Sequence, residues 1–484
     1  MKTLTLLLCF FSFLNSNCQN IQFNDSTFKQ RLIQEGVDTN FDDEISITEA
    51  EVVTYLNIGY NWPYNEISDI TEIYYFANID TLLCGGNSLT SLDVSNNSNL
   101  KLLDCSGNYF LDTLLLGNNV NIEEINLDYV YTQNAFDFSG LPNLKVLRFS
   151  HVNNLDVSNN LNLEELLCDF SSGPINVSNN PNLIKLICKN QEYLDVTNSP
   201  LLEYLECEGG IYKLTEIDLS NNTSLKKLVL WFNNISQLNL SQNTALQFID
   251  CSFNLIQNID FTNNVNSEYI ACGGDSLQNI NVTGLVNLET LATGNFLDST
   301  SSNLMDLDVS TNTSLRRLYC PSGNLSLLDL SANNQLEELY CGYNDFDTLI
   351  LCANTNLWYL HIDGMPQLTH VFIPDTTQPP AYYAFGSPNF NFADCTMLGL
   401  EDISYNIPEI SIYPNPANDK IYFDNLTVNS NLIYKIIDLS SNIIKTEKFD
   451  SEFINISSLA TGIYIIQVAD NKEIIYQTKL IKID

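Results

Sequence analysis

The stretch NLKLLDCSGN spans Asn99 to Asn108, and close variants of it recur along the chain. The variants NLEELLCDFS, ALQFIDCSFN, SLRRLYCPSG and QLEELYCGYN keep its leucine spacing and place a cysteine in the same slot. Taking that slot as an anchor gives positions that lie mostly 19 to 23 residues apart: Cys84, Cys105, Leu127, Phe149, Cys168, Cys188, Cys207, Leu230, Cys251, Cys272, Thr293, Cys320, Cys341 and Ile362. A period of this length predicts stacked units, each of which buries its apolar face only against its neighbours.

Each unit reads LxxLxCxxN, then a turn, then LDVSxNxxL. This pattern resembles the leucine-rich repeat, and the resemblance covers Val53 to Pro374. It implies a mostly β fold, a solenoid with a curved parallel sheet. Ile58 fits as an earlier anchor, followed by an irregular insertion around Trp62 and Pro63.

The anchor cysteines are predicted to fill the core as small apolar side chains. Parallel side chains on neighbouring strands do not suit the disulfide torsion, so these thiols should stay unbridged. A metal ladder is the alternative, but tetrahedral ligands must converge. The asparagine of each S-x-N step is predicted to donate to and accept from the backbone of stacked turns, and these residues are Asn97, Asn160, Asn180, Asn222, Asn243, Asn264, Asn312, Asn333 and Asn354.

Two cysteines lie off this ladder. Cys352 occupies the serine slot of LCANTNL, and Cys395 follows the final anchor in NFADCTM. In an exported chain this pair predicts a disulfide that ties down the end of the solenoid.

Residues 1–18 have a lysine, an apolar run and small or polar residues before Gln19, which predicts a secretory signal peptide. Lipidation of Cys18 is the alternative. No later segment is apolar for long enough to span a membrane. Residues 19–52 predict a helical cap, whose loop follows an EF-hand pattern with Asp38, Asn40, Asp42, Glu44, Ser46 and Glu49 at positions 1, 3, 5, 7, 9 and 12.

Hard oxygen ligands at these spacings predict a structural Ca²⁺ site. Asp43 stands where the motif has glycine, and aspartate tolerates the left-handed backbone better than most residues. The alternative is an acidic cap that shields the first coil and binds no metal.

Residues 375–409 lose the period and predict an end cap and a linker. Residues 410–484 alternate apolar and polar residues between turns, which predicts a small antiparallel β-sandwich. The string YPNP, the turn Thr461-Gly462 before Tyr464 and the terminal KLIKID resemble the type A C-terminal sorting domain of the Bacteroidetes type IX secretion system. The resemblance implies export through the outer membrane, removal of the domain, and surface attachment or release. An accessory binding domain is the alternative.

The chain has 484 residues and a formal net charge of −38, which argues against nucleic acid or anionic lipid as partners. No nucleophile elbow or phosphate-binding glycine loop is present, and we predict a monomeric binding protein that is not an enzyme. Its histidines are His151, His361 and His370. An acid/base or metal pair built from His361, Asp363 and His370 is the catalytic alternative.

Residues one before, one after and three before each anchor should point out of the solenoid on its concave face. The predicted binding residues there are Tyr204, Trp231, Phe248, Tyr269, Tyr319, Tyr340, Tyr359 and His361, with Leu167, Ile187 and Val229 as exposed aliphatics and Gly273, Gly294 and Gly342 as an open floor. The hypothesis is a secreted or surface protein that binds a protein partner. The alternatives are a polysaccharide ligand, and an inert envelope protein whose aromatics only stack on one another.

Overall fold

The computed structural model describes most of the chain. The described residues are 19–59, 66–132, 134–151, 154–168, 173–274, 277–294, 303–387, 390–395, 411–415, 417–424, 426, 432–438, 443–449, 453–470 and 473–482. The predicted signal peptide and the insertion at Trp62 and Pro63 lie outside them, as does most of the predicted linker. The chain divides into two compact units, Met1–Gly399 and Leu400–Asp484.

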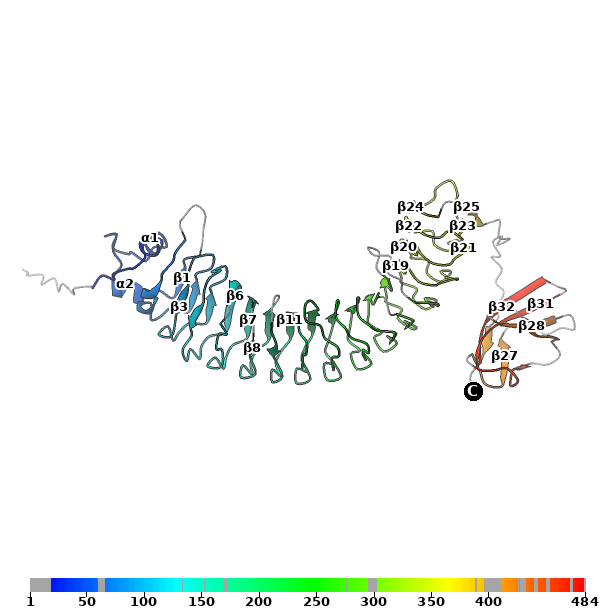
Figure 1. The fold of residues 1–484 in the computed structure, drawn as a ribbon, viewed down its shortest axis with the longest axis horizontal. Helices are drawn as coiled ribbons and strands as arrows, with labels where there is room; N and C mark the ends of the chain where they lie inside the picture. Colours follow the sequence, from blue (N-terminus) through cyan, green and yellow to red (C-terminus); the bar gives the residue numbers. More distant parts are fainter. Residues whose placement is uncertain are drawn as a thin grey trace, which may run out of the picture. The chain divides into compact units, whose positions relative to one another are not determined.

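A 16-stranded parallel sheet runs through the first unit and lines the inner side of the arc (Figure 1). Each coil contributes one strand. In sheet order the strands are β1 (Tyr55–Asn57), β2 (Thr81–Leu83), β4 (Leu102–Asp104), β6 (Glu124–Tyr131), β7 (Val146–His151), β9 (Glu165–Cys168), β11 (Lys185–Lys189), β12 (Tyr204–Glu208), β13 (Lys227–Val229), β14 (Phe248–Asp250), β16 (Tyr269–Ala271), β18 (Thr290–Ala292), β19 (Arg317–Tyr319), β20 (Glu338–Tyr340), β22 (Tyr359–His361) and β24 (Ala381–Tyr383).

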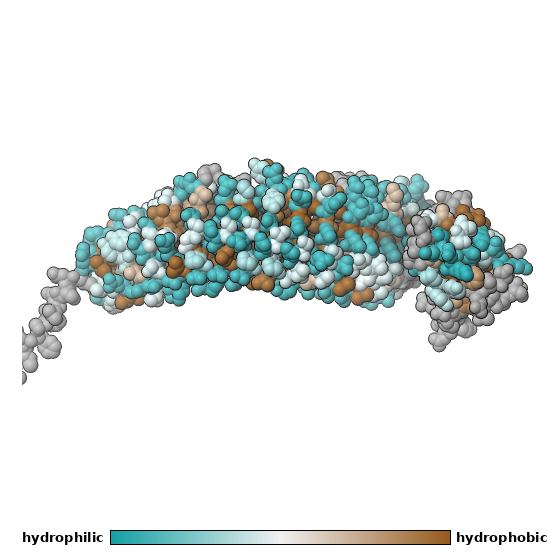
Figure 2. Space-filling model, turned by 90° about the horizontal axis from the view of Figure 1, so that it is seen from below, coloured by the Kyte–Doolittle hydropathy of each residue, from teal (hydrophilic) through white to brown (hydrophobic). Residues whose placement is uncertain are grey.

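Short parallel sheets lie on the outer side, where the LDVS segments of neighbouring coils pair. They join β3 (Ser91–Asp93) with β5 (Thr113–Leu115), β8 (Leu155–Asp156) with β10 (Ile175–Asn176), β15 (Asn258–Asp260) with β17 (Asn279–Asn281), and β21 (Thr348–Ile350) with β23 (His370–Ile373) and β25 (Asn391–Asp394). Hydrophilic residues predominate on this side, with interrupted apolar patches between them (Figure 2).

The core between the two sides is built from the predicted anchors. Every anchor is buried, with at most 5% of its surface exposed. The nine described ladder cysteines are not disulfide-bonded, and they pack with the leucines and isoleucines of the phrase into one continuous core. Burial raises the pKa of seven of these thiols, that of Cys320 to about 12, so these seven sulfurs stay protonated at neutral pH; they are Cys84, Cys105, Cys188, Cys251, Cys272, Cys320 and Cys341. The anchors therefore act as core filler, as the phrase predicts.

Two rows of asparagines bind neighbouring coils together. The asparagine that ends each LxxLxCxxN phrase uses all of its polar groups: Asn254 Nδ2 donates to the carbonyls of Leu230 and Cys251, at 2.8 and 3.0 Å, and its Oδ1 accepts from the Ile235 amide at 2.9 Å. The S-x-N row only donates. Asn243 Nδ2, for example, donates to the carbonyls of Leu219 and Asn222. The prediction that the S-x-N amide also accepts is wrong for the described residues, because Oδ1 in this row has no donor there.

A helical cap covers the first coil. Helix α1 (Ser26–Gln34) begins after Asp25, whose Oδ1 accepts from the amides of Thr27 and Phe28. The other carboxylate oxygen of Asp25 accepts from the amide and hydroxyl of Ser68, which joins the cap to the solenoid. Helix α2 (Ile47–Glu51) and the 3-10 helix η1 (Thr71–Tyr75) complete this end.

The second unit consists of two antiparallel sheets around one apolar cluster. One sheet contains β26 (Ser411–Tyr413), β27 (Lys420–Asp424) and β30 (Phe453–Asn455), and the other contains β28 (Leu432–Asp438), β29 (Ile443–Lys448), β31 (Gly462–Asp470) and β32 (Glu473–Lys482). Among the described residues, no helix has the length and apolar character needed to cross a membrane.

Candidate functional site

The inner face of the solenoid, meaning the solvent side of the 16-stranded sheet, presents two columns of side chains. The first column contains the residue three before each anchor, and the second contains the residue one before it. The middle residue of each strand, such as Leu339, is buried, whereas its neighbours Glu338 and Tyr340 are half-buried. Because the strands pair in register, each column places equivalent side chains of successive coils next to one another.

Aromatic side chains fill the second column at its C-terminal end. Tyr319, Tyr340, His361 and Tyr383 occupy equivalent positions on β19, β20, β22 and β24. The ring centroids of Tyr319 and Tyr340 are 4.9 Å apart, those of Tyr340 and His361 are 5.1 Å apart, and those of His361 and Tyr383 are 6.1 Å apart. Tyr359 in the first column also stacks on Tyr340, at 5.1 Å. We call these five residues the C-terminal aromatic row.

The hydroxyl of Tyr319 donates to Glu338 Oε2 at 2.8 Å. Burial and this carboxylate raise the pKa of Tyr319, so the phenol keeps its proton. The rings of the row cover one another only in part: Tyr340 and His361 stack at 10°, Tyr319 lies at 59° to Tyr340, and Tyr383 is 60% exposed.

A second group of aromatics lies in the first column of the middle coils. The rings of Phe248 and Tyr269 stack at 4.3 Å with an interplanar angle of 1°. Tyr204 lies two strands earlier in the same column. Trp231, one residue after its anchor, contacts the edge of Phe232 at 5.0 Å. The predicted binding residues thus fall into two groups on one sheet, and both groups contain the self-stacking that the alternative hypothesis required.

Several other predicted features of the inner face differ from the structure. Val229, predicted to be exposed, is buried, with 8% of its surface exposed. Gly273, Gly294 and Gly342 do not form an open floor. A Cβ added at Gly273 would lie 2.8 Å from the backbone of Gly294, and one at Gly342 would lie 2.7 Å from the Asp363 carbonyl oxygen. These glycines allow adjacent coils to approach each other closely.

His361 and His370 do not lie together in one site. His361 Nε2 lies 3.3 Å from Asp363 Oδ2 on the inner face. His370 is exposed at the start of β23, in an outer sheet, where it stacks on Phe372 at 5.9 Å. The acid/base pair considered from the sequence would need both rings on the same face.

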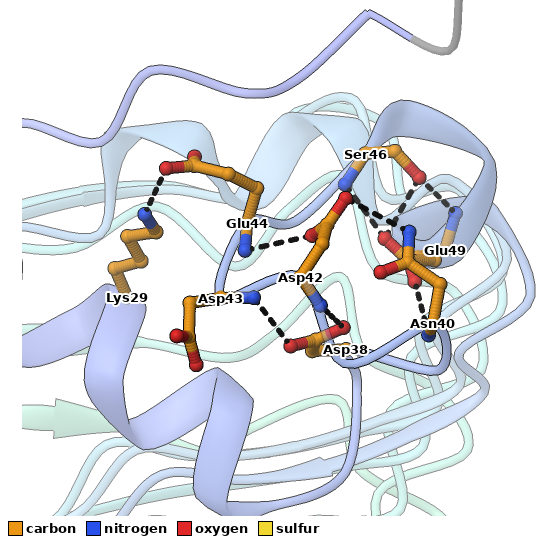
Figure 3. Close-up of polar contacts among 8 residues, drawn as sticks. All are labelled: Lys29, Asp38, Asn40, Asp42, Asp43, Glu44, Ser46 and Glu49. Carbon is orange, nitrogen blue, oxygen red and sulfur yellow. Dashed lines mark hydrogen bonds and ion pairs between the residues drawn. The ribbon is translucent and has the colours of Figure 1, made fainter.

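The residues predicted to bind Ca²⁺ lie in the loop between α1 and α2 and, for Glu49, in the first turn of α2 (Figure 3). Asp38 Oδ1 accepts from the amide of Phe41 at 2.7 Å, and its Oδ2 accepts from the amide of Asp43 at 3.0 Å. Asp43 has a φ of 61°, which is the left-handed turn that the EF-hand pattern places at this position. The backbone of the loop therefore agrees with the pattern.

The side chains of the loop do not fit a bound ion in this conformation. Glu49 Oε2 accepts from the amide and hydroxyl of Ser46, at 2.9 and 2.8 Å (Figure 3). Its Oε1 accepts from the amide and hydroxyl of Thr39, both at 2.8 Å. Asn40 Nδ2 donates to Asp42 Oδ2, and Glu44 pairs with Lys29. Among the described residues, no three His, Cys, Asp or Glu side chains lie close enough together to hold a metal. Ca²⁺ binding stays a prediction.

Glu49 should make the cap sensitive to acid. Burial alone would raise its pKa, but the hydrogen bonds from Ser46 and Thr39 outweigh burial and lower the pKa to about 2. A carboxylate whose pKa is lowered in the folded state contributes stability above its ordinary value of 4.5, and that contribution is lost as the pH falls from there to about 2. We expect Glu49→Gln to destabilise the cap by about 2 kcal/mol at pH 7 and to have little effect near pH 2.

Thermal melting of the two proteins across this pH range, with Glu51→Gln as the exposed control, measures the effect. Equal melting temperatures at pH 7 would contradict it. Repeating the pH 7 melt with Ca²⁺ and with a chelator tests the metal: a bound ion raises the melting temperature of the unchanged protein but not that of an Asp38→Ala, Glu49→Ala variant.

Cys352 and Cys395 form a disulfide in the structure, at a sequence separation of 43. Cys395 directly follows β25, the last strand of the outer sheet, and Cys352 follows β21 of the same sheet. The bridge therefore links the end of the solenoid to the coil two strands before it.

Comparison with known proteins separates the two units. Residues 411–483 match the family model of the secretion system C-terminal sorting domain. No curated protein matches the chain. The functional domain of InlJ from Listeria monocytogenes, a structure described as including a cysteine ladder, is 22% identical, with a TM-score of 0.55 over 96% of this chain and 100% of that one.

An internalin, InlF, from the same organism is 18% identical, with a TM-score of 0.42 over 77% of this chain and 95% of that one. A leucine-rich repeat protein of Leptospira interrogans is 17% identical, with a TM-score of 0.44 over 64% of this chain and 77% of that one. The likeness to InlJ shows the fold of the solenoid. The family match identifies residues 411–483 as a secretion system C-terminal sorting domain. The chain is a secreted or cell-surface protein in which a leucine-rich repeat solenoid precedes a secretion system C-terminal sorting domain.

Proposed function

We propose that the solenoid binds a protein partner through its inner face, and that the protein acts in adhesion or recognition at or beyond the cell surface without catalysing a reaction. The observation that carries this proposal is the C-terminal aromatic row. Its rings are held in register on four consecutive strands, half-buried against one another, with Tyr383 60% exposed at its end. Aligned aromatics with polar tips are the residue type that most often anchors protein interfaces.

The stacking of the rings favours a protein over a polysaccharide. A sugar binds an aromatic ring by lying against its free face. In this row Tyr359 and His361 stack on Tyr340, at interplanar angles of 29° and 10°, so Tyr340 offers a sugar less free face than an isolated ring would. Ring edges suit the side chains and backbone groups of a polypeptide.

The test is a binding screen of residues 19–402 against extracted surface proteins and a glycan array. We expect protein partners whose affinity falls at least about tenfold in a Tyr319→Ala, Tyr340→Ala variant, because central aromatic anchors dominate interface energetics. Tyr193→Ala, which removes an exposed tyrosine outside the inner sheet, is the matched control. Glycan partners would replace the proposal with polysaccharide capture, and no partner of either kind would favour an inert envelope protein.

Export should depend on the second unit. Deleting residues 411–483 is expected to leave the protein in the periplasm, because this segment matches the sorting domain that the secretion machinery recognises. Fractionation of cells that express the full and shortened chains measures this, and fusion of residues 411–483 to a periplasmic reporter is the reciprocal control. Normal surface appearance of the shortened chain would refute the assignment to this export route.

A further inference from the structure

The basic residues of the solenoid are confined to one side of it. Between Val53 and Pro374 the chain has ten lysines and arginines, in a protein whose net charge is −38. Nine of them lie in the strands of the inner sheet or directly before a strand: Lys101, Lys145, Arg148, Lys185, Lys189, Lys226, Lys227, Arg316 and Arg317. Lys213 is the exception. The cations of the solenoid are therefore concentrated at the inner face, where acidic side chains such as Glu165, Glu206 and Asp250 accompany them.

Most of these cations are already compensated. Five form ion pairs with a glutamate of a neighbouring coil: Lys145 with Glu123, Arg148 with Glu124, Lys189 with Glu208, Lys226 with Glu203, and Arg316 with Glu337. Lys185, Lys227 and Arg317 differ. All three are in the first column, and none has a carboxylate within 4.0 Å among the described residues.

Lys185 and Lys227 lie on either side of Tyr204. The three residues are in register on β11, β12 and β13. The ammonium groups are 5.4 and 4.6 Å from the centroid of the Tyr204 ring, and Lys227 Nζ also lies 5.0 Å from the centroid of Phe248. These aromatic contacts hold the lysine chains in place without neutralising their charge.

Two acidic groups lie near the lysine pair. Glu206 accepts a hydrogen bond from the Tyr204 hydroxyl at 2.9 Å, and that hydroxyl accepts from Lys227 Nζ at 2.9 Å. Glu165, on the neighbouring strand β9, is the register partner of Lys185. Since neither glutamate pairs directly with a lysine, the two ammonium groups keep donors for an incoming carboxylate.

Arg317 occupies the same column four strands after Lys227, which corresponds to about 19 Å at a strand spacing of about 4.8 Å. Its Nε donates to Thr290 Oγ1 at 3.0 Å, and no partner is recorded for its remaining N–H groups among the described residues. Between the two cations lie the stacked rings of Phe248 and Tyr269 in the first column, and Asp250, Ala271 and Ala292 in the second.

We propose that the inner face from β11 to β19 binds an extended acidic polypeptide segment, with one carboxylate between Lys185 and Lys227, an apolar stretch along Phe248 and Tyr269, and a second carboxylate at Arg317. The position between Lys185 and Lys227 lies on β12, five strands or about 24 Å from Arg317. An extended chain advances about 3.3 Å per residue, so the two acids are about seven residues apart. Asp250 disfavours a third acid between them. This inference rests on the proposed function and names the chemistry of its partner.

A polypeptide fits this surface better than an anionic glycan. The two faces of the Phe248 ring are covered by Tyr269 and Lys227, and Tyr204 is flanked by two ammonium groups. No face of either ring is left on which a sugar could lie. Carboxylate, apolar and aromatic side chains at varied spacings are instead what a protein segment supplies.

The test uses the full chain and fluorescence anisotropy with a labelled random copolymer of glutamate and tyrosine at low ionic strength. A Lys185→Gln, Lys227→Gln, Arg317→Gln variant should bind the copolymer at least about thirtyfold more weakly than the unchanged protein, since each lost cation removes a charge-assisted contact. The control Lys101→Gln, Lys145→Gln, Lys213→Gln changes the net charge by the same amount outside the inner face from β11 to β19 and should lose less than about threefold. A Lys185→Arg, Lys227→Arg variant should retain binding.

Equal weakening in the two charge-matched variants would overturn the proposal, since it would show a general charge effect. Binding of polygalacturonate but not of the copolymer would overturn it in favour of an anionic glycan. Failure of the unchanged protein to bind the copolymer would also overturn it, yet would leave the proposed function standing, because that function is judged by the effect of Tyr319 and Tyr340 on surface-protein partners. Thermal melting of each variant separates lost contacts from lost folding.

Discussion

Replacing Asn254 by aspartate is expected to lower the free energy of unfolding of the coils around it by about 3 to 5 kcal/mol. The side chain is buried, and its amide nitrogen donates to the carbonyls of Leu230 and Cys251. Aspartate has the same shape but no N–H, so both carbonyls would lose their donor and a carboxyl group would face them. Each orphaned buried acceptor costs about 1 to 3 kcal/mol, and the acid adds the cost of staying protonated or of burying a charge.

The damage should spread only to the neighbouring coils. In a solenoid each unit contacts only the units beside it, so a weak coil divides the array into two cooperative blocks. We expect urea unfolding followed by circular dichroism to change from one transition to two, and hydrogen exchange to accelerate between residues 230 and 275. Asn266→Asp is the matched control, because Asn266 also donates to the preceding coil, at the Thr244 carbonyl, but is exposed. A loss of less than 1 kcal/mol at Asn254, or an equal loss at Asn266, would show that the buried row does not hold the coils together.

Removing the disulfide by Cys352→Ser and Cys395→Ser is expected to lower the stability of the C-terminal end of the solenoid. The bridge closes a loop of 43 residues, for which chain-entropy arguments give a stabilisation of about 4 kcal/mol. Because coils are coupled only to their neighbours, the loss should concentrate in β21, β23 and β25 and leave the middle of the array unchanged.

Limited proteolysis and hydrogen exchange of residues 348–395 measure this loss. A reductant should produce the same change in the unchanged protein and no further change in the double variant, since the other described cysteines are buried and not disulfide-bonded. Equal proteolysis of the oxidised and reduced protein would contradict the expectation.

The repeat made the fold predictable because its period and its chemistry agree at every anchor. Leu, Phe, Thr, Ile and Cys all occupy the slot, and all are buried, so apolar volume at a fixed spacing was a sufficient signal. The sequence did not distinguish the two asparagine rows. Asn243 and Asn254 are the same residue type, and only the position of an amide from the neighbouring coil decides which one can accept.

The inner face was predictable as a set of positions but not as a set of contacts. Alternation along the strand placed Tyr340 and Phe248 towards solvent. It could not show that Phe248 stacks on Tyr269 or that the space beside Gly273 belongs to the next coil. In the same way, the spacing of Asp38 and Glu49 predicted a loop that gathers carboxylates, but not that backbone amides and hydroxyls would take up their oxygens.

Because the ladder cysteines are buried in the folded protein, the order of coil stacking and cysteine oxidation matters for maturation. Thiol–disulfide exchange needs an accessible thiolate, and burial raises the pKa of thiols such as Cys251 and Cys341 well above the usual range. Once the coils have stacked, these sulfurs can neither attack the Cys352–Cys395 bridge nor be reached by an oxidant. Before stacking, the same sulfurs are open to scrambling in an oxidising compartment. Correct maturation therefore requires the coils to stack faster than their cysteines are oxidised. The yield of correctly folded protein on export then depends on the ratio of these two rates.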